Sequence, residues 1–492
     1  MKLSFPKMAS RTVWLAALWL LPLASAEAAK PAADADAVLD RWVEASGGAK
    51  RLKAIQQSDY HLRLAFGPSV VLDATGTALA SGPHRLVMQT PAGEVTSADD
   101  GRIAWVHHAS LGGRVLEPDR AERDRRTTGP AEALRVKRDY PQRLRLPDEQ
   151  LDGKTVRVVE LTDACGWKER WYFNGSTGLR VRREQLDEEK GGTVDYADFR
   201  KVNGIVEPFR AQMRMRNGSG SSLEVLAATH ATKVTAERWV PPEGLEADSR
   251  RIDEAVRKFQ TAMGSKEAFA KIKTRVTRAR VEVPASGISA AMSISIREPD
   301  RILIEQDVPG MGRMLQGFDG KTGWAWGEMQ GYRELHGAEL VQLAATAKLA
   351  PRIGGDEAPL RRIVNESTDA DGHAVLAVDF STVAGSTGIC HFDLETGLLV
   401  KVETLLQTGP GSTFKAVMEL SDYREVDGVK VAFVQAVSNP AMRVVTRLLE
   451  VEHNRELADE LFLPRKNGEI PVPADTAKPA DKGAASEPVP RA

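Results

Sequence analysis

The stretch Asp422–Phe433, with the sequence DYREVDGVKVAF, decides the fold of this chain. It predicts two strands joined by a tight turn at Asp427-Gly428, because Asp-Gly between alternating apolar and polar residues is a strong hairpin signal. The same pattern occurs at Tyr196–Phe209, YADFRKVNGIVEPF, with Asn203-Gly204 at the turn. This pair of hairpins indicates that the chain contains an internal duplication.

Further segments repeat along the chain at a nearly constant spacing of about 220 residues. For example, ASGGAKRLKAI, which begins at Ala45, returns as AMGSKEAFAKI from Ala262. We therefore predict two tandem domains of one fold, the first at residues 36–244 and the second at 251–467. The Pro- and Ala-rich tail at 468–492 is expected to be disordered.

Each domain is expected to open with a helical cap, at Ala37–Ala45 in the first and over 252–263 in the second. A series of strand-like segments follows, with a helical insertion that is clearest at Gly337–Leu349. Residues 131–144 could form either a helix or a covering loop. Because a sheet of this size has to curl, the predicted class is α+β: two tandem units, each a strongly curved antiparallel half-barrel of about 10–11 strands, covered by helices.

The first 26 residues predict a secretory signal peptide. A basic segment with Arg11 precedes the short apolar run Val13–Leu23, and Ala24-Ser25-Ala26 is a small-residue cleavage site. No Cys follows this site, so we expect a soluble exported protein without a lipid anchor, periplasmic if the source is a Gram-negative bacterium. The net charge of −1 and the absence of a basic run with aromatics argue against nucleic-acid binding.

Signatures of enzymes and of cofactor or metal sites are missing from the sequence, so no catalytic residue, cofactor or metal ligand is predicted. Cys165 and Cys390 are the two cysteines, and they read as unpaired thiols, although export leaves a disulfide chemically possible. His107 and His108 are adjacent in a predicted strand, where neighbouring side chains point to opposite faces and cannot chelate one ion together.

The most distinctive chemistry in the sequence is apolar and lies in Gly310–Leu335, which is rich in Met, Trp and Gly. Methionine suits surfaces that accept irregular apolar partners. These residues are either the core of a curved sheet or the lining of a cavity for an acyl chain, and the second domain is the favoured binder. The candidate ligand-binding residues are Met311, Met314, Leu315, Phe318, Trp324, Trp326, Met329 and Tyr332, together with Trp105 of the first domain.

These motifs resemble the LolA-like, outer-membrane lipoprotein-sorting family of periplasmic proteins, in tandem duplication. The likeness rests on GFDGKTGWAW, GYRELHGAEL and the closing DYREVDGVKVAF hairpin, and it covers the second domain more closely than the first. The resemblance implies a half-barrel of about eleven strands with a helical lid, and a hydrophobic cavity that shields acyl chains. It also implies membrane-bound donor or acceptor proteins as partners.

Two functions of different class follow. The first is a periplasmic, non-enzymatic carrier that binds lipid or a lipidated protein by burying acyl chains, with lid movement controlling release. The second is a periplasmic sensor or scaffold that binds a protein partner and carries no lipid. An exported hydrolase is a third alternative, for which the sequence offers no catalytic constellation.

Overall fold

The structure is a computed structural model, and it describes most of the chain between residues 32 and 468. The described residues are 32–67, 70–187, 191–216, 218–237, 239–350, 353, 360–369, 371–382, 385–409 and 412–468. The signal peptide expected at 1–26 lies outside them, as does the tail expected at 468–492 except for Gly468.

The first sheet has thirteen strands in the order β6-β5-β4-β3-β2-β1-β13-β12-β11-β10-β9-β8-β7. Its strands are β1 (Gln57–Phe66), β2 (Val70–Leu79), β3 (His84–Thr90), β4 (Gly93–Asp99), β5 (Ala104–His108), β6 (Gly112–Val115), β7 (Gln142–Leu151), β8 (Lys154–Thr162), β9 (Lys168–Asn174), β10 (Arg180–Gln185), β11 (Gly192–Val202), β12 (Ile205–Met215) and β13 (Gly220–Ala231).

The second sheet repeats this order with every strand number raised by thirteen, from β19 at one edge to β20 at the other. Its strands are β14 (Thr274–Val283), β15 (Ile288–Arg297), β16 (Arg301–Val308), β17 (Gly312–Phe318), β18 (Gly323–Gly327), β19 (Gly331–Leu335), β20 (Leu360–Thr368), β21 (Ala374–Thr382), β22 (Gly385–Asp393), β23 (Leu399–Gly409), β24 (Ser412–Val426), β25 (Val429–Ser438) and β26 (Arg443–His453).

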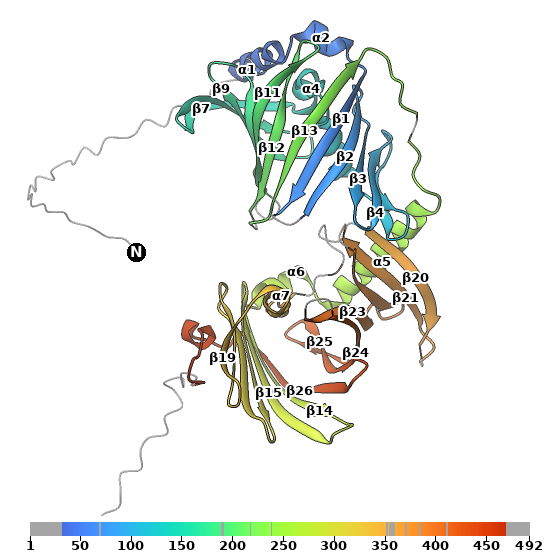
Figure 1. Cartoon of the computed structure of the whole chain (residues 1–492), viewed down its shortest axis with the longest axis vertical. Helices are drawn as coiled ribbons and strands as arrows, with labels where there is room; N and C mark the ends of the chain where they lie inside the picture. Colours follow the sequence, from blue (N-terminus) through green and yellow to red (C-terminus); the bar gives the residue numbers. More distant parts are fainter. Residues whose placement is uncertain are drawn as a thin grey trace, which may run out of the picture. The chain divides into compact units, whose positions relative to one another are not determined.

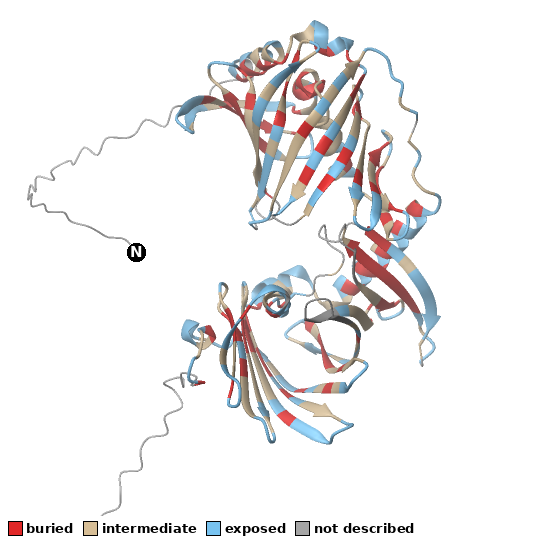
Figure 2. Cartoon of the chain, in the orientation of Figure 1, coloured by how far each residue is buried: buried red, intermediate tan, exposed pale blue. Residues whose placement is uncertain are grey.

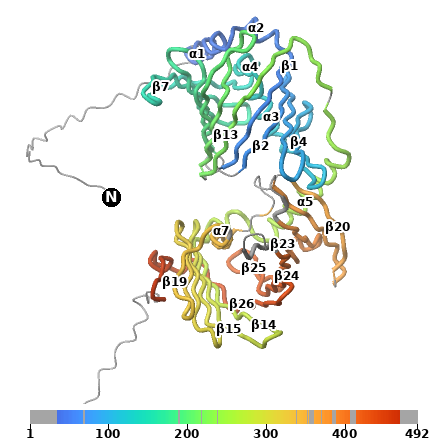
Figure 3. Tube along the Cα trace, in the orientation of Figure 1, coloured from blue at the N-terminus to red at the C-terminus, as the bar shows by residue number. Residues whose placement is uncertain are grey.

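The predicted fold class is confirmed, because the chain forms two antiparallel sheets of one topology with helices against them. Figure 1 shows the strong curvature of the second sheet. In each sheet the first strand lies beside the last, and Figure 3 shows β1 and β13 in this arrangement. The sheets contain thirteen strands rather than the expected 10–11, because short edge segments such as β6 and β19 show too little alternation to be recognised as strands.

Seven α-helices and one 3-10 turn are found in the described part of the chain. They are α1 (Ala32–Ala45), α2 (Ala49–Ala54), α3 (Pro118–Arg126), α4 (Glu132–Asp139), α5 (Leu245–Met263), α6 (Lys266–Lys271), α7 (Gly337–Thr346) and η1 (Asp459–Phe462). The ambiguous stretch 131–144 contains both α4 and the start of β7. None of these helices is long and apolar enough to cross a bilayer.

The two predicted hairpins are confirmed. Val426 pairs with Val429 across the turn, and Asp427 and Gly428 both have positive φ, at 51° and 79°. Asn203 and Gly204 have the same conformation, at 50° and 87°. Two positive φ values in a two-residue turn match the twist of the flanking strands.

The strands before the two hairpins carry a second shared feature. Arg200 binds Asp198 and stacks on Phe209 at 4.6 Å, and Arg424 binds Asp422 and stacks on Phe433 at 4.4 Å. Both aspartates have positive φ. The duplication therefore extends to individual side-chain contacts.

Glycines make the close approach between helix and hairpin possible in both sheets. A Cβ on Gly47 would lie 2.7 Å from the carbonyl oxygen of Gly204, and a Cβ on Gly264 would lie 2.8 Å from that of Gly428. Both glycines also have positive φ, at 127° and 134°. A side chain at either position would push the helix end away from the turn.

Buried and exposed residues alternate along the strands, as Figure 2 shows for β1 and β2. The chain divides into two compact units, and the division crosses the first sheet. One unit is Met1–Ile55, Ala65–Ser69 and Pro130–Val225, and the other is Gln56–Leu64, Val70–Gly129 and Leu226–Ala492. The domain limits 36–244 and 251–467 stay a prediction, and each of these ranges contains one complete sheet.

Candidate functional site

Two tryptophans occupy the same place in the two sheets. Trp105 in β5 lies opposite Ala98 of β4, and Trp324 in β18 lies opposite Gly317 of β17. Both side chains lie on the face that points away from the neighbouring helix, α3 in the first sheet and α7 in the second. We call this the outer face of the strand group β1–β6 and of the group β14–β19.

On the second sheet, the chain itself covers the outer face. The 3-10 turn η1 places Phe462 in a buried cluster with Leu315 and Trp324. The indole nitrogen of Trp324 donates a hydrogen bond to the main-chain carbonyl of Phe462 at 3.0 Å. Trp324 and Phe462 are both fully buried, so this segment fills the surface.

On the first sheet, the equivalent surface carries an open cleft of about 660 Å³. Strands β1 to β5 form its floor, and residues 236, 237 and 239–242, which follow β13, form a wall. The floor residues are Gln57, Asp59, Thr75, Thr77, Arg85, Val87, Thr96, Ala98, Trp105 and His107, and the wall residues are Ala236, Glu237, Trp239, Val240 and Pro242. This volume lies within the range of ligand-binding clefts.

A polar network fixes this wall to the floor. Gln57 accepts hydrogen bonds from the main-chain N–H groups of Thr235 and Ala236, both at 2.9 Å. The Gln57 amide also donates to Asp59 at 2.8 Å, and Thr77 donates to the other Asp59 oxygen at 2.7 Å. Buried Gln57 therefore ties the returning segment to the sheet, and the cleft keeps a defined edge.

Three positions on the floor of the cleft are polar where the second sheet is apolar. Strand register equates Arg85 with Leu303, Thr96 with Leu315, and His107 with Trp326. Burial lowers the pKa of His107, and its neighbour His108 lowers it further, so the ring is neutral at pH 7. The first sheet thus offers hydrogen-bonding groups where the second offers apolar side chains.

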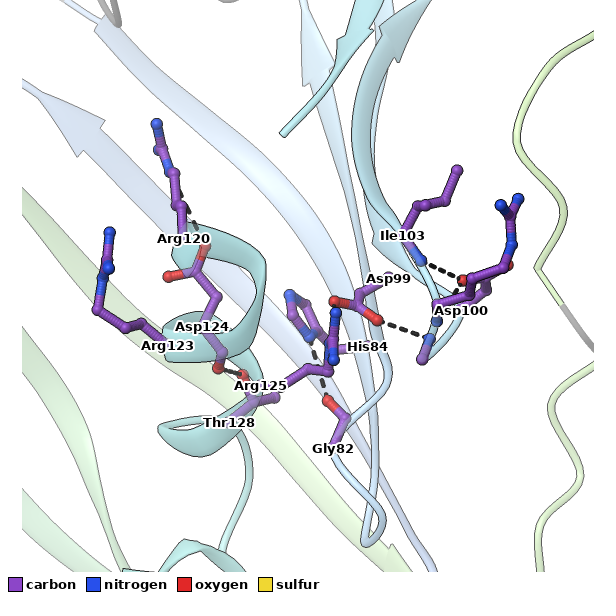
Figure 4. A network of polar contacts seen from close by, with 12 residues as sticks. Gly82, His84, Asp99, Asp100, Ile103, Arg120, Arg123, Asp124, Arg125 and Thr128 are labelled. Carbon is purple, nitrogen blue, oxygen red and sulfur yellow. Dashed lines mark hydrogen bonds and ion pairs between the residues drawn. The ribbon is translucent and has the colours of Figure 1, made fainter. Parts of the chain in front are cut away.

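The faces that meet α3 and α7 differ in the same way. In the first sheet, buried Asp99 accepts a hydrogen bond from Arg125 of α3 at 2.7 Å and one from the main chain of Gly101 at 2.6 Å. Figure 4 shows this network between α3 and the β4–β5 turn. The counterpart of Asp99 is Phe318, which packs in a cluster with Leu343 of α7.

The contact between α7 and the second sheet is almost entirely apolar. Helix residues Leu340 and Leu343, with Ala347 just after the helix, contribute to one cluster with sheet residues such as Ile302 and Phe318. Among the described residues, the ion pair between Glu339 and Arg333 is the single one that links α7 to the sheet. Both partners of this pair are about half exposed.

The helix α4 of the first sheet adds a buried ion pair to its apolar contacts with the core. Arg180 of β10 donates two hydrogen bonds to Glu132 of α4, at 2.6 and 2.8 Å, and stacks on Trp171 at 4.3 Å. Burial alone would lower the pKa of Arg180, but Glu132 and Tyr196 raise it overall. The counterpart of Arg180 in the second sheet is Leu399.

The nine candidate residues do not line one common hollow. Leu315, Trp324, Trp326 and Tyr332 lie together on the outer face of the second sheet beneath Phe462. Phe318 lies on the opposite face under α7, and Met314 shares that face by register. Met311 and Met329 are exposed, and Trp105 lies in the cleft of the first sheet. Ligand binding by these residues stays a prediction.

Sequence reasoning missed the cleft in the first sheet. Arg85, Thr96 and His107 come from three separate strands and join only when these strands pair. The available signal was the comparison of the repeats, where His107 and His108 replace the aromatic and glycine residues of the second domain.

Titratable clusters elsewhere have structural partners. Asp369, His373 and Asp393 lie close enough to hold an ion, but the two carboxylates accept main-chain hydrogen bonds of their own turns, at 2.8 to 3.0 Å. Cys165 and Cys390 are free thiols. Burial raises the pKa of Cys390 to about 12, so this thiol stays protonated at neutral pH.

Comparison with known proteins gives structural likenesses only. No family model matches the chain, and no curated protein matches it. A DUF1329 family protein from Desulfovibrio piger is similar in structure at 13% identity and a TM-score of 0.32, over 43% of this chain and 99% of that one. A LolA superfamily protein from Nitrosomonas europaea is similar at 19% identity and a TM-score of 0.30, over 43% of this chain and 96% of that one.

A longer likeness is that to MucB in the MucA/MucB complex of Pseudomonas aeruginosa, at 11% identity and a TM-score of 0.17. It covers 86% of this chain and 100% of that one. The chain therefore resembles LolA-like proteins, as its motifs indicate. The TM-scores are low, so these likenesses assign no function to this chain.

Proposed function

We propose that this chain is an exported, periplasmic binding protein that carries an acyl chain of a lipid or lipidated protein between α7 and the second sheet. The observation that carries the proposal is the nature of the α7 contact. The helix covers Ile302, Phe318 and Leu335 through apolar side chains, and its described ion pair with the sheet lies at an exposed edge.

An apolar contact of this kind can be exchanged for an acyl chain at small net cost. Lifting α7 exposes apolar surface, and each methylene group that takes its place returns about 0.8 kcal/mol. A buried ion pair could not be exchanged in this way, because an acyl chain cannot satisfy the separated charges. We therefore assign lipid binding to the second sheet. In the first sheet, the ion pair of Glu132 with Arg180 keeps the helix α4 in place.

The central test measures uptake of a fluorescent fatty acid by the chain from Glu27 onward. Phe318→Asp gives the second sheet an aspartate at the position of Asp99 in the first sheet. The new carboxylate has no partner for its charge there. We expect this variant to lose at least about tenfold in affinity, equal to about 1.4 kcal/mol. Val341→Asp is the matched control, because Val341 belongs to α7 itself but is 69% exposed, and it should bind as the parent does.

A second variant keeps the test informative if Phe318→Asp does not fold. A Cβ on Gly323 would lie 2.5 Å from a side-chain carbon of Leu340 in α7, so Gly323→Ala loosens the lid without adding charge. The counterpart in the first sheet is Ala104. We expect faster exchange of the fatty acid in Gly323→Ala.

Mass spectrometry of a solvent extract from gently purified protein completes the test. Co-purified lipid supports carriage. A lipid-free extract from protein that also takes up no fatty acid would contradict it.

A further inference from the structure

We propose that Arg275, His453 and Asp427 form an acid-sensitive contact in the second sheet, which separates when His453 takes up a proton. We call it the His453 contact. Its side chains come from β14, from the end of β26 and from the turn between β24 and β25. The contact stands on its own geometry, whereas its effect on a bound acyl chain rests on the proposed function.

His453 makes one hydrogen bond at each ring nitrogen. Arg275 lies directly opposite His453 in the pairing of β14 with β26, and its Nε–H donates to His453 Nε2 at 2.9 Å. On the other side of the ring, Nδ1 lies 2.9 Å from a carboxylate oxygen of Asp427. Since an arginine N–H can only donate, Nε2 is the acceptor and Nδ1 carries the proton that is donated to Asp427. This arrangement requires a neutral imidazole.

A proton on His453 disrupts this arrangement. Nε2 would then carry a hydrogen that points at the guanidinium, and a second cation would lie beside Arg275 on a side chain that is fully buried. Burial lowers the pKa of His453 most, Arg275 lowers it further, and Asp427 from the turn opposes them. In the described part of the chain, Arg275 has no carboxylate partner that could compensate its charge.

The direction of the pH effect follows from the lowered pKa of His453. In the unfolded chain a histidine has a pKa of 6.5, so the unfolded chain takes up the proton before the folded chain does. The contribution of the His453 contact to stability is therefore present above pH 6.5 and is lost as the pH falls below that value.

The first sheet makes a similar contact without the arginine. There Ser58 of β1 meets His230 of β13, with the serine oxygen 2.9 Å from Nδ1. A hydroxyl can donate to a neutral ring or accept from a protonated one, so this hydrogen bond is possible in both states of the ring. The second sheet therefore has an acid-sensitive form of a contact that the first sheet makes with a serine.

The His453 contact adjoins the apolar cluster under α7. Val429, two residues after Asp427, is fully buried in that cluster together with Leu343 of α7. Val429 also forms a β-bridge with Gly264 at the end of α5. Release of the turn would therefore loosen the region in which we place the acyl chain, and acid would speed the exit of that chain.

Hydrogen exchange followed by mass spectrometry tests the His453 contact without any lipid. The chain from Glu27 onward is compared at about pH 7 and about pH 5, with the rates corrected for the effect of pH on exchange itself. We expect the peptides that cover β26 and the turn at Asp427 to lose at least about tenfold in protection at the lower pH.

His453→Gln is the central variant, because an amide can accept from Arg275 and donate to Asp427 but does not titrate. We expect it to keep its protection at both pH values. Arg275→Ser, which copies Ser58, should also remove most of the response, since a hydroxyl can accept from a protonated ring. His230→Gln is the matched control in the first sheet, and its β26 should respond as that of the parent does.

Release of a fluorescent fatty acid tests the consequence for carriage. We expect the parent to release it about tenfold faster at about pH 5 than at about pH 7, and His453→Gln to release it at one rate. Binding with one release rate at both pH values in the parent would overturn the role in release. A chain that binds no fatty acid would overturn the acyl site instead, and exchange at β26 would still decide on the contact.

Two results of the exchange experiment would overturn the His453 contact itself. The peptides of β26 and of the turn could keep their full protection in the parent at the lower pH. Alternatively, His453→Gln and Arg275→Ser could both respond to acid as the parent does, which would place the titrating group elsewhere.

Discussion

The two sheets share one topology and differ in the chemistry of their surfaces. The first sheet has Asp99 and Arg180 where the second has Phe318 and Leu399. On the outer face of the first sheet a polar cleft remains open, and on that of the second the chain's own Phe462 closes the surface.

This difference shows which residues fix the fold and which are free to change. The hairpin turns and the glycines at the helix ends are alike in both sheets, because they set backbone geometry. The residues between sheet and helix need only fill space and satisfy one another, with ion pairs at α3 and α4 of the first sheet and apolar contact at α7 of the second. The same backbone can therefore support a helix with a buried ion pair in one sheet and a helix with an apolar contact in the other.

The largest expected effect is on the buried ion pair of the first sheet. Arg180→Leu installs the residue of the second sheet but leaves Glu132 buried without a partner, which should cost about 3–5 kcal/mol of unfolding free energy. Urea denaturation followed by tryptophan fluorescence measures this loss, since Trp42 and Trp171 adjoin the arginine.

The double variant Arg180→Leu, Glu132→Leu is the control for this prediction. It should recover most of the loss, because no charge is then left buried. Equal losses in the single and double variants would mean that the stacking of Arg180 on the aromatic rings matters more than its charge.

A smaller effect, equal in both sheets, is expected at the helix-end glycines. Gly47→Ala and Gly264→Ala each force a side chain into a positive-φ position against a carbonyl oxygen. We expect a cost of about 1–3 kcal/mol for each, measured by denaturation of the two variants side by side. A clear difference between them would contradict the view that backbone geometry is what the two sheets share.

The smallest effect concerns acid stability of the second sheet. Hydrogen bonds from Lys415 and Lys401 lower the pKa of Glu403 from 4.5 to about 2. A carboxylate with a lowered pKa stabilises the fold above its ordinary pKa, so this contribution is lost as the pH falls from about 4.5 to 2. We expect roughly 1 kcal/mol, because Lys415 is largely exposed and the pair is screened.

Comparison of urea midpoints at pH 6 and pH 3 measures this contribution. Glu403→Gln should reduce the difference between them. Glu184→Gln is the matched variant, since Glu184 is the counterpart and accepts from the neutral hydroxyl of Tyr172 at 2.7 Å. A full pH difference that survives in Glu403→Gln would show that other carboxylates cause it.

The duplication, the hairpins and most helices were predictable because they depend on local signals such as turn dipeptides and apolar spacing. The edge strands β6 and β19 were not, since short strands of mixed polarity have no clear period. The candidate site was predicted only in part. Period-two alternation places Trp324 and Trp326 on one face, but the cover over that face comes from Phe462, far along the chain.

The pairing of the first strand of each sheet with its last has a consequence for folding kinetics. Strands β1 and β13, like β14 and β26, are separated by nearly the whole sequence of their sheet, so the contact order is high. Such a sheet folds slowly, because loop closure must be completed before the central strands can pair. During synthesis, neither sheet can form its centre until its last strand has emerged, and until then its apolar strands are exposed to aggregation.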